Sequence, residues 1–396
     1  MPTSRRAVLG AMMIMPLSSA MTRPLSASGP PFSGAGQNGW NGPMERSLPG
    51  ENAVQFGAAI RPDQLTVESP LLSAIRTSDI LVPEYHGQWS AVEWRRGNPW
   101  FGNYDAITEF AHRHGQKVRG HSLIWEQMTP QWARDEMLDR RDWRTVSLHF
   151  ANLLKRYRGR IDEWVVVNEM IDTEQGSRGM RRTSFHEAFG SDYVAQALHT
   201  AHRLDPAARL MINEYGLTHD NPVDERRRRA LLRLVERLKA DGVPLHIVGI
   251  QGHLELAKGA VPQRRIARFM RELAETGVQL ALTEVDVLED DRFRSLAERD
   301  RRVEAAVTQL LEVACAEPAM KSVTTWGLSD RHSWLQERDE GSMAALALLP
   351  QGHEHLNRGL PFDHDMQPKS MNGKLALART RALGSSQPPG GNQALG

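Results

Sequence analysis

The sequence predicts an α/β protein whose single domain is a (β/α)8 barrel. Eight short, largely apolar runs recur along the chain, and amphipathic helical segments lie between many of them. Continuous apolar strands are typical of parallel sheets covered by helices on both faces. Eight such units over roughly 330 residues match a closed barrel with loop insertions. A doubly wound open sheet is the alternative architecture, but no glycine-rich nucleotide-binding turn follows the first run.

The expected strands are Val54–Ile60, Asp79–Val82, Lys117–Ile124, Glu163–Asn168, Arg209–Asn213, His246–Gln251, Gln279–Val285 and Ser322–Trp326. Helical spacing is clearest in Asp224–Ala240, with apolar residues at Leu231, Leu234, Val235 and Leu238. The same i, i+3, i+4, i+7 spacing precedes the last strand, at Val303, Val307, Leu310, Leu311 and Ala314. The run Arg226–Arg229 near the start of a helix is interpreted as a solvent-facing surface, with contact to an anionic polymer as the alternative.

Composition excludes several classes of protein. Lysine and arginine together number 49 and aspartate and glutamate 48, so the overall charge favours neither nucleic acid nor an anionic membrane as a partner. The one cysteine, Cys315, excludes an internal disulfide framework and is expected to be a buried structural thiol. No His-x-His or His-Glu-x-x-His pair lies at an expected strand end, so we expect no metal and no cofactor. We also expect a monomer.

The two ends of the chain differ from its middle. Residues 1–28 combine the pair Arg5-Arg6 with an apolar stretch and small residues, the pattern of a twin-arginine-type signal peptide. Residues 29–50 predict a flexible linker, 51–383 the barrel domain and 384–396 a disordered tail. We therefore expect a periplasmic or secreted protein that leaves the membrane once the signal is removed.

Polar residues follow several of the expected strands. Glu169 comes directly after Asn168 at the end of the fourth strand, and Glu284 ends the seventh. Other strand ends carry His121, Asn213, Gln251 and Trp326. Barrel enzymes place their catalytic groups at the C-terminal ends of the strands, so these side chains are expected to gather at one mouth.

Two carboxyl groups facing each other beside aromatic side chains fit the hydrolysis of glycosidic bonds. One acid protonates the leaving oxygen, while the other attacks the anomeric carbon or activates water. A gap of about 5–5.5 Å between the carboxyl groups gives retention of configuration and a wider gap gives inversion. Tryptophan side chains cover the apolar faces of sugars, and Asn, Gln and His side chains bond their hydroxyl groups.

The ordered set of motifs resembles glycoside hydrolase family ten, the endo-1,4-beta-xylanase family, in a divergent form. Val165–Glu169 resembles its acid/base strand and Leu282–Asp286 its nucleophile strand. Further matches in family order are Phe56–Ala59, Val118–Trp125, Thr129–Trp132, Ile212–Tyr215, Ile250–Leu254, Thr325–Asp330, Ser333–Trp334 and Pro368–Lys369. Each motif alone is weakly specific, whereas the ordered set covers the chain from about residue 54 to 378.

The resemblance implies a retaining hydrolase with a covalent glycosyl-enzyme intermediate and a β-1,4-linked polysaccharide such as xylan as substrate. Glu169 is then the acid/base and Glu284 the nucleophile, with His253 supporting Glu284 and Asn168 contacting the sugar 2-hydroxyl. The pKa of Glu169 should be raised relative to that of Glu284. The implied substrate-binding residues are Glu84, Tyr85, Gln88, His121, Trp125, Glu126, Met128, Asn213, Gln251, Trp326 and Trp334.

Several of these positions depart from the family pattern. Tyr85 and Gln88 stand where the family usually has Asn and Lys, which hold the next sugar toward the non-reducing end. Glu126-Gln127-Met128 replaces His-Ser-Gln after Trp125, and Glu214 replaces an Asp. Sites that bond substrate through buried polar groups discriminate strongly between substrates. The accepted glycan is therefore expected to be xylan or a xylan-like polysaccharide. The alternative is a substituted chain or a bacterial exopolysaccharide backbone.

Two other classes of function remain alternatives at this level. A non-catalytic glycan-binding protein on the same scaffold is expected where either carboxylate is lost, and both Glu169 and Glu284 are present. A metalloenzyme barrel is the other alternative, but the 15 histidines supply no recognisable ligand set at the strand ends.

Overall fold

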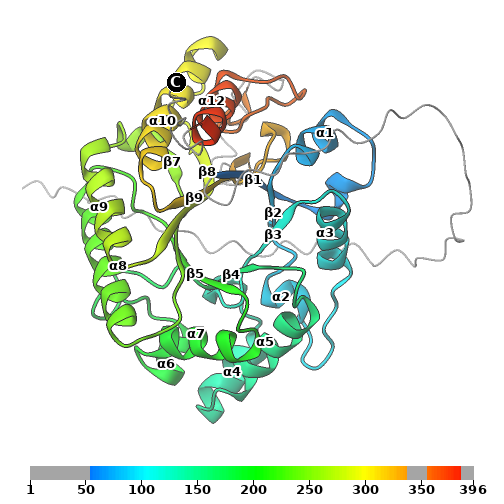
Figure 1. Ribbon diagram of the computed structural model, residues 1–396, viewed down its shortest axis with the longest axis vertical. Coiled ribbons are helices and arrows are strands. Elements are labelled where there is room, and N and C mark those ends of the chain that lie inside the picture. Colours follow the sequence, from blue (N-terminus) through cyan, green and yellow to red (C-terminus); the bar gives the residue numbers. More distant parts are fainter. Residues whose placement is uncertain (1–53, 337–354, 385–396) are drawn as a thin grey trace, which may run out of the picture. The chain divides into compact units, whose positions relative to one another are not determined.

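The computed structural model describes residues 54–336 and 355–384 (Figure 1). The signal peptide predicted for residues 1–28, the linker predicted for 29–50 and nearly all of the tail predicted for 384–396 lie outside these residues. Gly384, where the tail is expected to begin, is the last residue of helix α12 (Ser370–Gly384). Within the described residues, no helix is long and apolar enough to cross a membrane.

Eight parallel strands close into a barrel, which confirms the predicted fold class. The first six strands pair in chain order, the sixth (β6, Ile247–Ile250) pairs with β8 (Gln279–Leu288), and β8 pairs with β9 (Met320–Thr325), which returns to pair with β1 (Gln55–Ile60). A short additional strand, β7, pairs with the outer part of β8. The strands are β1 Gln55–Ile60, β2 Ile80–Pro83, β3 Lys117–Gly120, β4 Glu163–Asn168, β5 Arg209–Glu214, β6 Ile247–Ile250, β7 His253–Glu255, β8 Gln279–Leu288 and β9 Met320–Thr325.

Side chains fill the barrel interior, so the barrel is a packed core. One interior cluster contains Val165, Met211, Ile247 and Ala281, and another contains Ala59, Ile80, Val82 and Trp326. Arg119 of β3 is also enclosed, with its Nε 2.5 Å from Glu163 Oε1 and its Nη2 and Nη1 donating to Ser322 Oγ and Thr324 Oγ1. A buried guanidinium needs such partners because an unpaired buried charge is costly.

Helices surround the strands, and α12 packs beside α10 (Figure 1). They are α1 Pro70–Arg76, α2 Trp89–Val92, α3 Gly102–Arg113, α4 Gln131–Arg140, α5 Arg144–Arg156, α6 Ser184–Phe189, α7 Tyr193–Leu204, α8 Pro222–Ala240, α9 Gln263–Glu275, α10 Leu296–Ala316 and α12 Ser370–Gly384. Short 3-10 helices span Pro62–Leu65, Glu126–Met128, Leu256–Lys258 and Asp330–His332. The helix α8 begins where the Asn221 side chain accepts hydrogen bonds from the first backbone N–H groups.

The strands differ from the predicted ones at their boundaries and in the short β7, which was not predicted. The third strand ends at Gly120 and not at Ile124, which keeps only an isolated bridge to Val167. The seventh predicted strand, β8, continues three residues beyond Val285. Cys315 is half-buried on α10, so the expectation of a buried thiol is met only in part. The two residues before it, Val313 and Ala314, are buried.

Candidate active site

Backbone hydrogen bonds fix the two predicted catalytic carboxyls to neighbouring strands. The N–H of Glu169 donates to the carbonyl oxygen of Asn213 on β5 at 2.9 Å, and the N–H of Glu284 donates to that of Gln251 at 2.7 Å. Both side chains are buried. The β8 register with β9 shifts between Leu282 and Val285, the segment that carries Glu284. Irregular pairing beside an active site re-aims side chains.

Glu169 adopts an uncommon backbone conformation. Its φ is +58°, in the left-handed region, which costs free energy for a residue with a Cβ. The Arg181 side chain opposes that cost, because its Nε donates to the Glu169 carbonyl oxygen at 2.8 Å. The Gln251 Nε2 donates to Glu169 Oε1 at 3.2 Å and holds the carboxyl group itself. Arg181 therefore positions the predicted acid/base from behind, a role that the sequence interpretation missed.

The Glu284 carboxylate accepts two side-chain hydrogen bonds. Asn213 Nδ2 donates to Oε1 at 2.6 Å, and His253 Nε2 lies 3.2 Å from Oε2. Asn213 is itself oriented, because its oxygen accepts from Thr283 Oγ1 at 2.7 Å and its Nδ2 also reaches Asn168 Oδ1 at 2.9 Å. The amides of Asn168 and Asn213, the Thr283 hydroxyl and the His253 ring thus form one hydrogen-bonded network with the Glu284 carboxylate.

His253 carries its charge because of a second carboxylate. Its Nδ1 lies 2.7 Å from Asp286 Oδ1, and the indole N–H of Trp334 donates to Asp286 Oδ2 at 2.6 Å. Burial alone would lower the pKa of His253, but Asp286 and Glu284 together raise it to about 10. At neutral pH the imidazolium therefore donates a hydrogen bond to each carboxylate. Asp286 was not predicted as a site residue, although its place two residues after Glu284 puts it on the same face of β8.

The environments of the two glutamates move their pKa values in opposite directions. Burial raises the pKa of Glu169, against the opposing effects of the Arg181 charge and the Gln251 hydrogen bond. Burial also opposes ionisation of Glu284, but the His253 hydrogen bond and the charges of His121 and His253 outweigh it and lower the pKa. A protonated acid beside an ionised carboxylate is the pairing that acid-assisted displacement requires.

Aromatic rings surround this carboxylate network. The ring of Trp326 packs edge-on against the rings of His121 and His253, with distances of 5.1 Å and 6.4 Å between ring centroids. Trp334 lies 5.2 Å from the His253 ring. His121 is buried at the start of a cis peptide bond to Ser122, and burial lowers its pKa. The structure therefore brings Glu169, Glu284, His253, Asn168, Asn213, Gln251, His121, Trp326 and Trp334 into one site.

Comparison with known proteins identifies the family of this chain. A family model described as glycosyl hydrolase family 10 matches residues 46–376. The chain belongs to glycosyl hydrolase family 10. The resemblance inferred from the motifs is thereby confirmed, and the chain is a glycoside hydrolase of xylanase type.

Individual relatives agree with the family assignment. The chain is 30% identical over 269 residues to a beta-1,4-xylanase of Dictyoglomus thermophilum, which covers 64% of this chain and 72% of that protein. It is 29% identical over 303 residues to an endo-1,4-beta-xylanase of Geobacillus stearothermophilus, covering 72% and 87%. Xylanase XynB of Paenibacillus barcinonensis, solved with a conduramine derivative, aligns with a TM-score of 0.69 at 26% identity over 83% of this chain and 98% of that one.

The fold is also shared with more distant structures. Xylanase 10B from Thermotoga petrophila RKU-1, solved in complex with xylobiose, aligns with a TM-score of 0.72 at 22% identity. The alignment covers 88% of this chain and all of that one. At this identity the likeness concerns the barrel architecture.

The positions that depart from the family pattern have partners within the protein. Gln88 is buried, and its Oε1 accepts a hydrogen bond from Ser122 Oγ at 3.0 Å. Glu126 Oε2 accepts from both the backbone N–H and the hydroxyl of Ser184, the first residue of α6. Met128 Sδ accepts from Ser90 Oγ at 3.9 Å. These contacts connect the loops after β2, β3 and β4, and the sugar contacts expected of Gln88, Glu126 and Met128 stay predictions.

The remaining predicted sugar-binding residues outside the carboxylate network lie after β2 and β3. Glu84 is buried directly after β2, and its Oε2 lies 3.8 Å from Arg61 Nη1. Tyr85, which follows it, is half-buried. Trp125 precedes the short helix Glu126–Met128 on the loop after β3. Roles in sugar binding for Glu84, Tyr85 and Trp125 also stay predictions.

The arginine run on α8 is only partly a solvent-facing surface. Arg227 and Arg228 are buried, whereas the side chains of Arg226 and Arg229 are 51% and 67% exposed. Arg227 Nη2 donates to the buried Glu214 at 2.7 Å. The interpretation of the whole run as solvated is therefore wrong, because the loop after β5 folds over the start of α8 and buries one side of it.

Glu214 and Arg227 form the centre of a charged cluster behind Glu169. Burial raises the pKa of Glu214 to about 7, against the opposing charges of Arg227 and Arg181. The guanidinium of Arg181 donates to the Tyr215 hydroxyl at 2.7 Å, and that of Arg227 lies 4.2 Å from the Tyr215 ring. The cluster links α8 to Arg181, whose side chain holds the Glu169 backbone.

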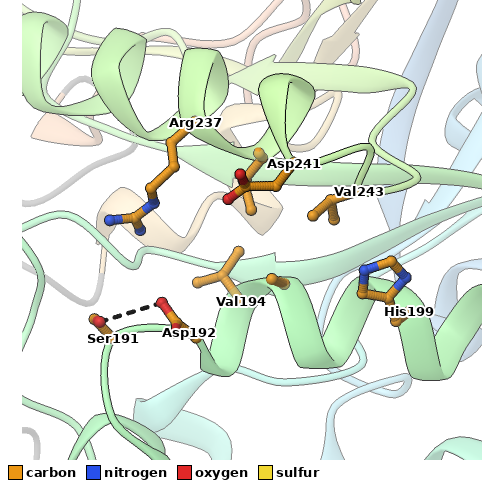
Figure 2. A pocket seen from close by; sticks show the side chains of 9 residues that line it. Ser191, Asp192, Val194, His199, Arg237, Asp241 and Val243 are labelled. Atoms are coloured by element: carbon orange, nitrogen blue, oxygen red, sulfur yellow. Dashed lines mark hydrogen bonds between the residues drawn. The ribbon is translucent and has the colours of Figure 1, made fainter.

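A separate surface cleft lies between α7 and α8. It has a volume of about 200 Å³, and Figure 2 shows Arg237 and Asp241 facing Asp192 and His199 across it. No predicted site residue lines it. Among the described residues, no group of three or more His, Cys, Asp or Glu side chains is arranged to hold a metal ion.

Proposed function

We propose that the protein is a retaining endo-acting hydrolase that cleaves β-1,4 bonds of xylan or a xylan-like polysaccharide by double displacement. The observation that carries the proposal is the opposite pKa displacement of Glu169 and Glu284 within one hydrogen-bonded site. In the first step Glu284 attacks the anomeric carbon while Glu169 gives its proton to the leaving oxygen. In the second step Glu169 takes a proton from water, whose oxygen displaces Glu284 and regenerates both groups.

The surrounding residues support each step. Glu284 starts ionised because the His253 imidazolium and Asn213 hydrogen-bond its two oxygens. As the ester forms, its charge is lost, and Asp286 continues to balance the imidazolium. Asn168, held at 2.9 Å from Asn213 Nδ2, is available to the sugar 2-hydroxyl, a contact that strengthens in the transition state. Relatives named as xylanases support the choice of a β-1,4-xylan backbone.

Product analysis tests the proposal. The wild type, the Glu284→Ala variant and the control Glu275→Ala, which alters an exposed glutamate at the end of α9, are assayed for reducing-sugar release. The panel contains unsubstituted xylan, substituted xylan, β-glucan and β-linked exopolysaccharides. We expect release from xylan by the wild type and the control, none by Glu284→Ala, and a β-anomer as the first product in proton NMR spectra. Equal release by Glu284→Ala, or an initial α-anomer, contradicts the mechanism; release from another polymer alone contradicts the substrate.

We also propose that a twin-arginine-type signal exports the enzyme to the periplasm or the medium. The pair Arg5-Arg6 followed by a short apolar stretch supports this. Cell fractionation of the wild type and an Arg5→Lys, Arg6→Lys variant tests it: export should stop in the variant, and equal export of both forms contradicts the proposal.

A further inference from the structure

One side chain outside the predicted site reaches the carboxyl group of the acid/base. Gln127 lies in the middle of the short helix Glu126–Met128, after β3, and its Nε2 is 3.5 Å from Glu169 Oε2. The other oxygen of the Glu169 carboxyl group, Oε1, accepts from Gln251 Nε2 at 3.2 Å. Gln251 is buried, whereas Gln127 is exposed. Glu169 Oε2 is therefore the oxygen on the solvent side, open to an incoming leaving group.

Contacts of its neighbours fix the backbone that carries Gln127. Glu126 Oε2 accepts from the backbone N–H of Ser184 at 3.0 Å and from its hydroxyl at 2.7 Å. Glu126 Oε1 lies 3.7 Å from Arg134 Nε, and the Glu126 carbonyl oxygen accepts from the N–H of Thr129 at 3.2 Å. The side chain of Gln127 is thus exposed on a fixed backbone, and such preorganisation reduces the entropic cost of holding a contact.

An amide suits a carboxyl group that changes its protonation state. Glu169 gives up a proton in the first proposed step and takes one from water in the second. A glutamine side chain carries both a donor and an acceptor, so Gln127 can donate to the carboxylate and accept from the protonated acid. Hydrogen bonds of catalytic groups are often long in the free enzyme and shorten once substrate binds. The separation of 3.5 Å between Gln127 and Glu169 fits such a contact.

The charges around the Glu169 carboxyl group come from other parts of the barrel. Arg181, in the segment after β4, favours the carboxylate, whereas Glu284 on β8 favours the protonated acid. Glu214 at the end of β5 and the adjoining Tyr215 also interact with the Glu169 charge. The short helix after β3 faces Glu169 with a neutral amide instead. A charge introduced at that position would therefore act on the acid/base without displacing an ion pair.

We propose that Gln127 is a positioning residue for the acid/base, whose amide holds Glu169 Oε2 where that oxygen exchanges its proton with the leaving group. The inference rests on the proposed function and adds a residue to it. In the first step the amide orients the protonated oxygen toward the glycosidic oxygen. In the second step it stabilises the carboxylate that takes a proton from water. Gln251 holds the opposite oxygen throughout, so the two amides together fix the plane of the carboxyl group.

Two aryl β-xylobiosides with different leaving groups test this role. The 2,4-dinitrophenolate group departs without a proton, whereas phenolate needs one from Glu169. For Gln127→Ala we expect about a three- to tenfold loss of kcat/KM on the phenyl xylobioside, as for one lost hydrogen bond, and less than about a twofold change on the dinitrophenyl xylobioside. Thermal unfolding midpoints verify that each variant is folded.

Two charged variants test the contact by the sign of their effect. Glu169 must hold a proton to start the reaction, so kcat/KM on the phenyl xylobioside falls as the pH rises through the pKa of Glu169. Gln127→Glu places a like charge beside the carboxyl group and raises this pKa, so the fall should move to higher pH by about one pH unit. Gln127→Lys lowers the pKa, so the fall should move to lower pH by about as much.

The matched controls are Gln131→Glu and Gln131→Lys, which place the same charges on an exposed glutamine bonded to Asp135. They should keep the wild-type pH profile, because solvent and salt screen exposed charges. Equal losses of Gln127→Ala on both xylobiosides indicate a structural role, and pH displacements that are absent or share one sign show that residue 127 does not contact the acid/base; either result overturns the inference. A wild type that cleaves neither xylobioside contradicts the proposed function instead.

Discussion

Replacing Asp286 by Asn should lower the pKa of His253, so that its imidazole ring loses its positive charge at a lower pH. The pKa of His253 rises from an ordinary 6.5 to about 10, and Asp286 is the largest of the contributions that raise it. At about 1.4 kcal/mol per tenfold change in the protonation equilibrium, the carboxylates outweigh burial by about 5 kcal/mol in favour of the imidazolium. Asp286 supplies the two largest contributions that raise the pKa, so its loss lowers the pKa of His253 and burial keeps the ring largely neutral above pH 8.

The loss of this charge changes Glu284 in a defined direction. The imidazolium helps hold the pKa of Glu284 low, so its removal raises that pKa. Because the imidazolium persists below the lowered pKa of His253, the loss of kcat/KM should grow as the pH rises through that pKa. The asparagine amide can also accept from only one of the two donors, His253 or Trp334, at its single oxygen. We expect about a ten- to hundredfold loss of kcat/KM above pH 8, where the neutral ring no longer stabilises the Glu284 carboxylate.

The assay combines a pH profile of aryl β-xylobioside hydrolysis with an NMR titration of the His253 ring. Asp290→Asn is the matched control, because it makes the same chemical change at an exposed ion pair with Arg302 just beyond β8. The control should keep the wild-type pH profile. An Asp286→Asn enzyme with a wild-type pH profile and a His253 ring still protonated at pH 9 would refute this electrostatic reasoning.

Two further substitutions test packing around the site. A Cβ on Gly249 would lie 2.2 Å from Asn213 Oδ1, so Gly249→Ala should displace the amide that bonds Glu284 and reduce kcat at least tenfold; unchanged kcat would show that Asn213 tolerates the shift. Arg119→Met should leave Glu163 without its buried partner and destabilise the barrel by about 3 kcal/mol in denaturant unfolding, and a variant as stable as the wild type would show that the interior charge adds nothing.

The barrel was predictable because its strands are buried on both faces. All eight predicted runs form barrel strands, since continuous apolar sequence has few other stable arrangements in a soluble α/β protein. The boundaries were less accurate, as where the third strand stops at Gly120. The short β7 was missed because it follows Gly252, whose φ of +81° turns the chain and interrupts the pattern.

Some residues of the candidate site could also be predicted from the sequence, whereas others could not. Glu169 and Glu284 could be found because strand ends converge at one mouth, so position along the chain predicts position in space. Asp286 was visible in the same strand by its alternation with Glu284, but its role depends on the register that places it opposite His253. Arg181 lies in a segment without periodicity, and only its tertiary contact with Glu169 reveals it.

Covalent trapping tests the assignment of the nucleophile most directly. The enzyme is incubated with 2,4-dinitrophenyl 2-deoxy-2-fluoro-β-xylobioside, whose fluorine slows breakdown of the glycosyl-enzyme, and the digested protein is sequenced by mass spectrometry. The account predicts one fluoroxylobiosyl group per enzyme, on the peptide that contains Glu284 and on that side chain. A label on Glu169 or any other residue, or continued turnover with no covalent adduct, would contradict it.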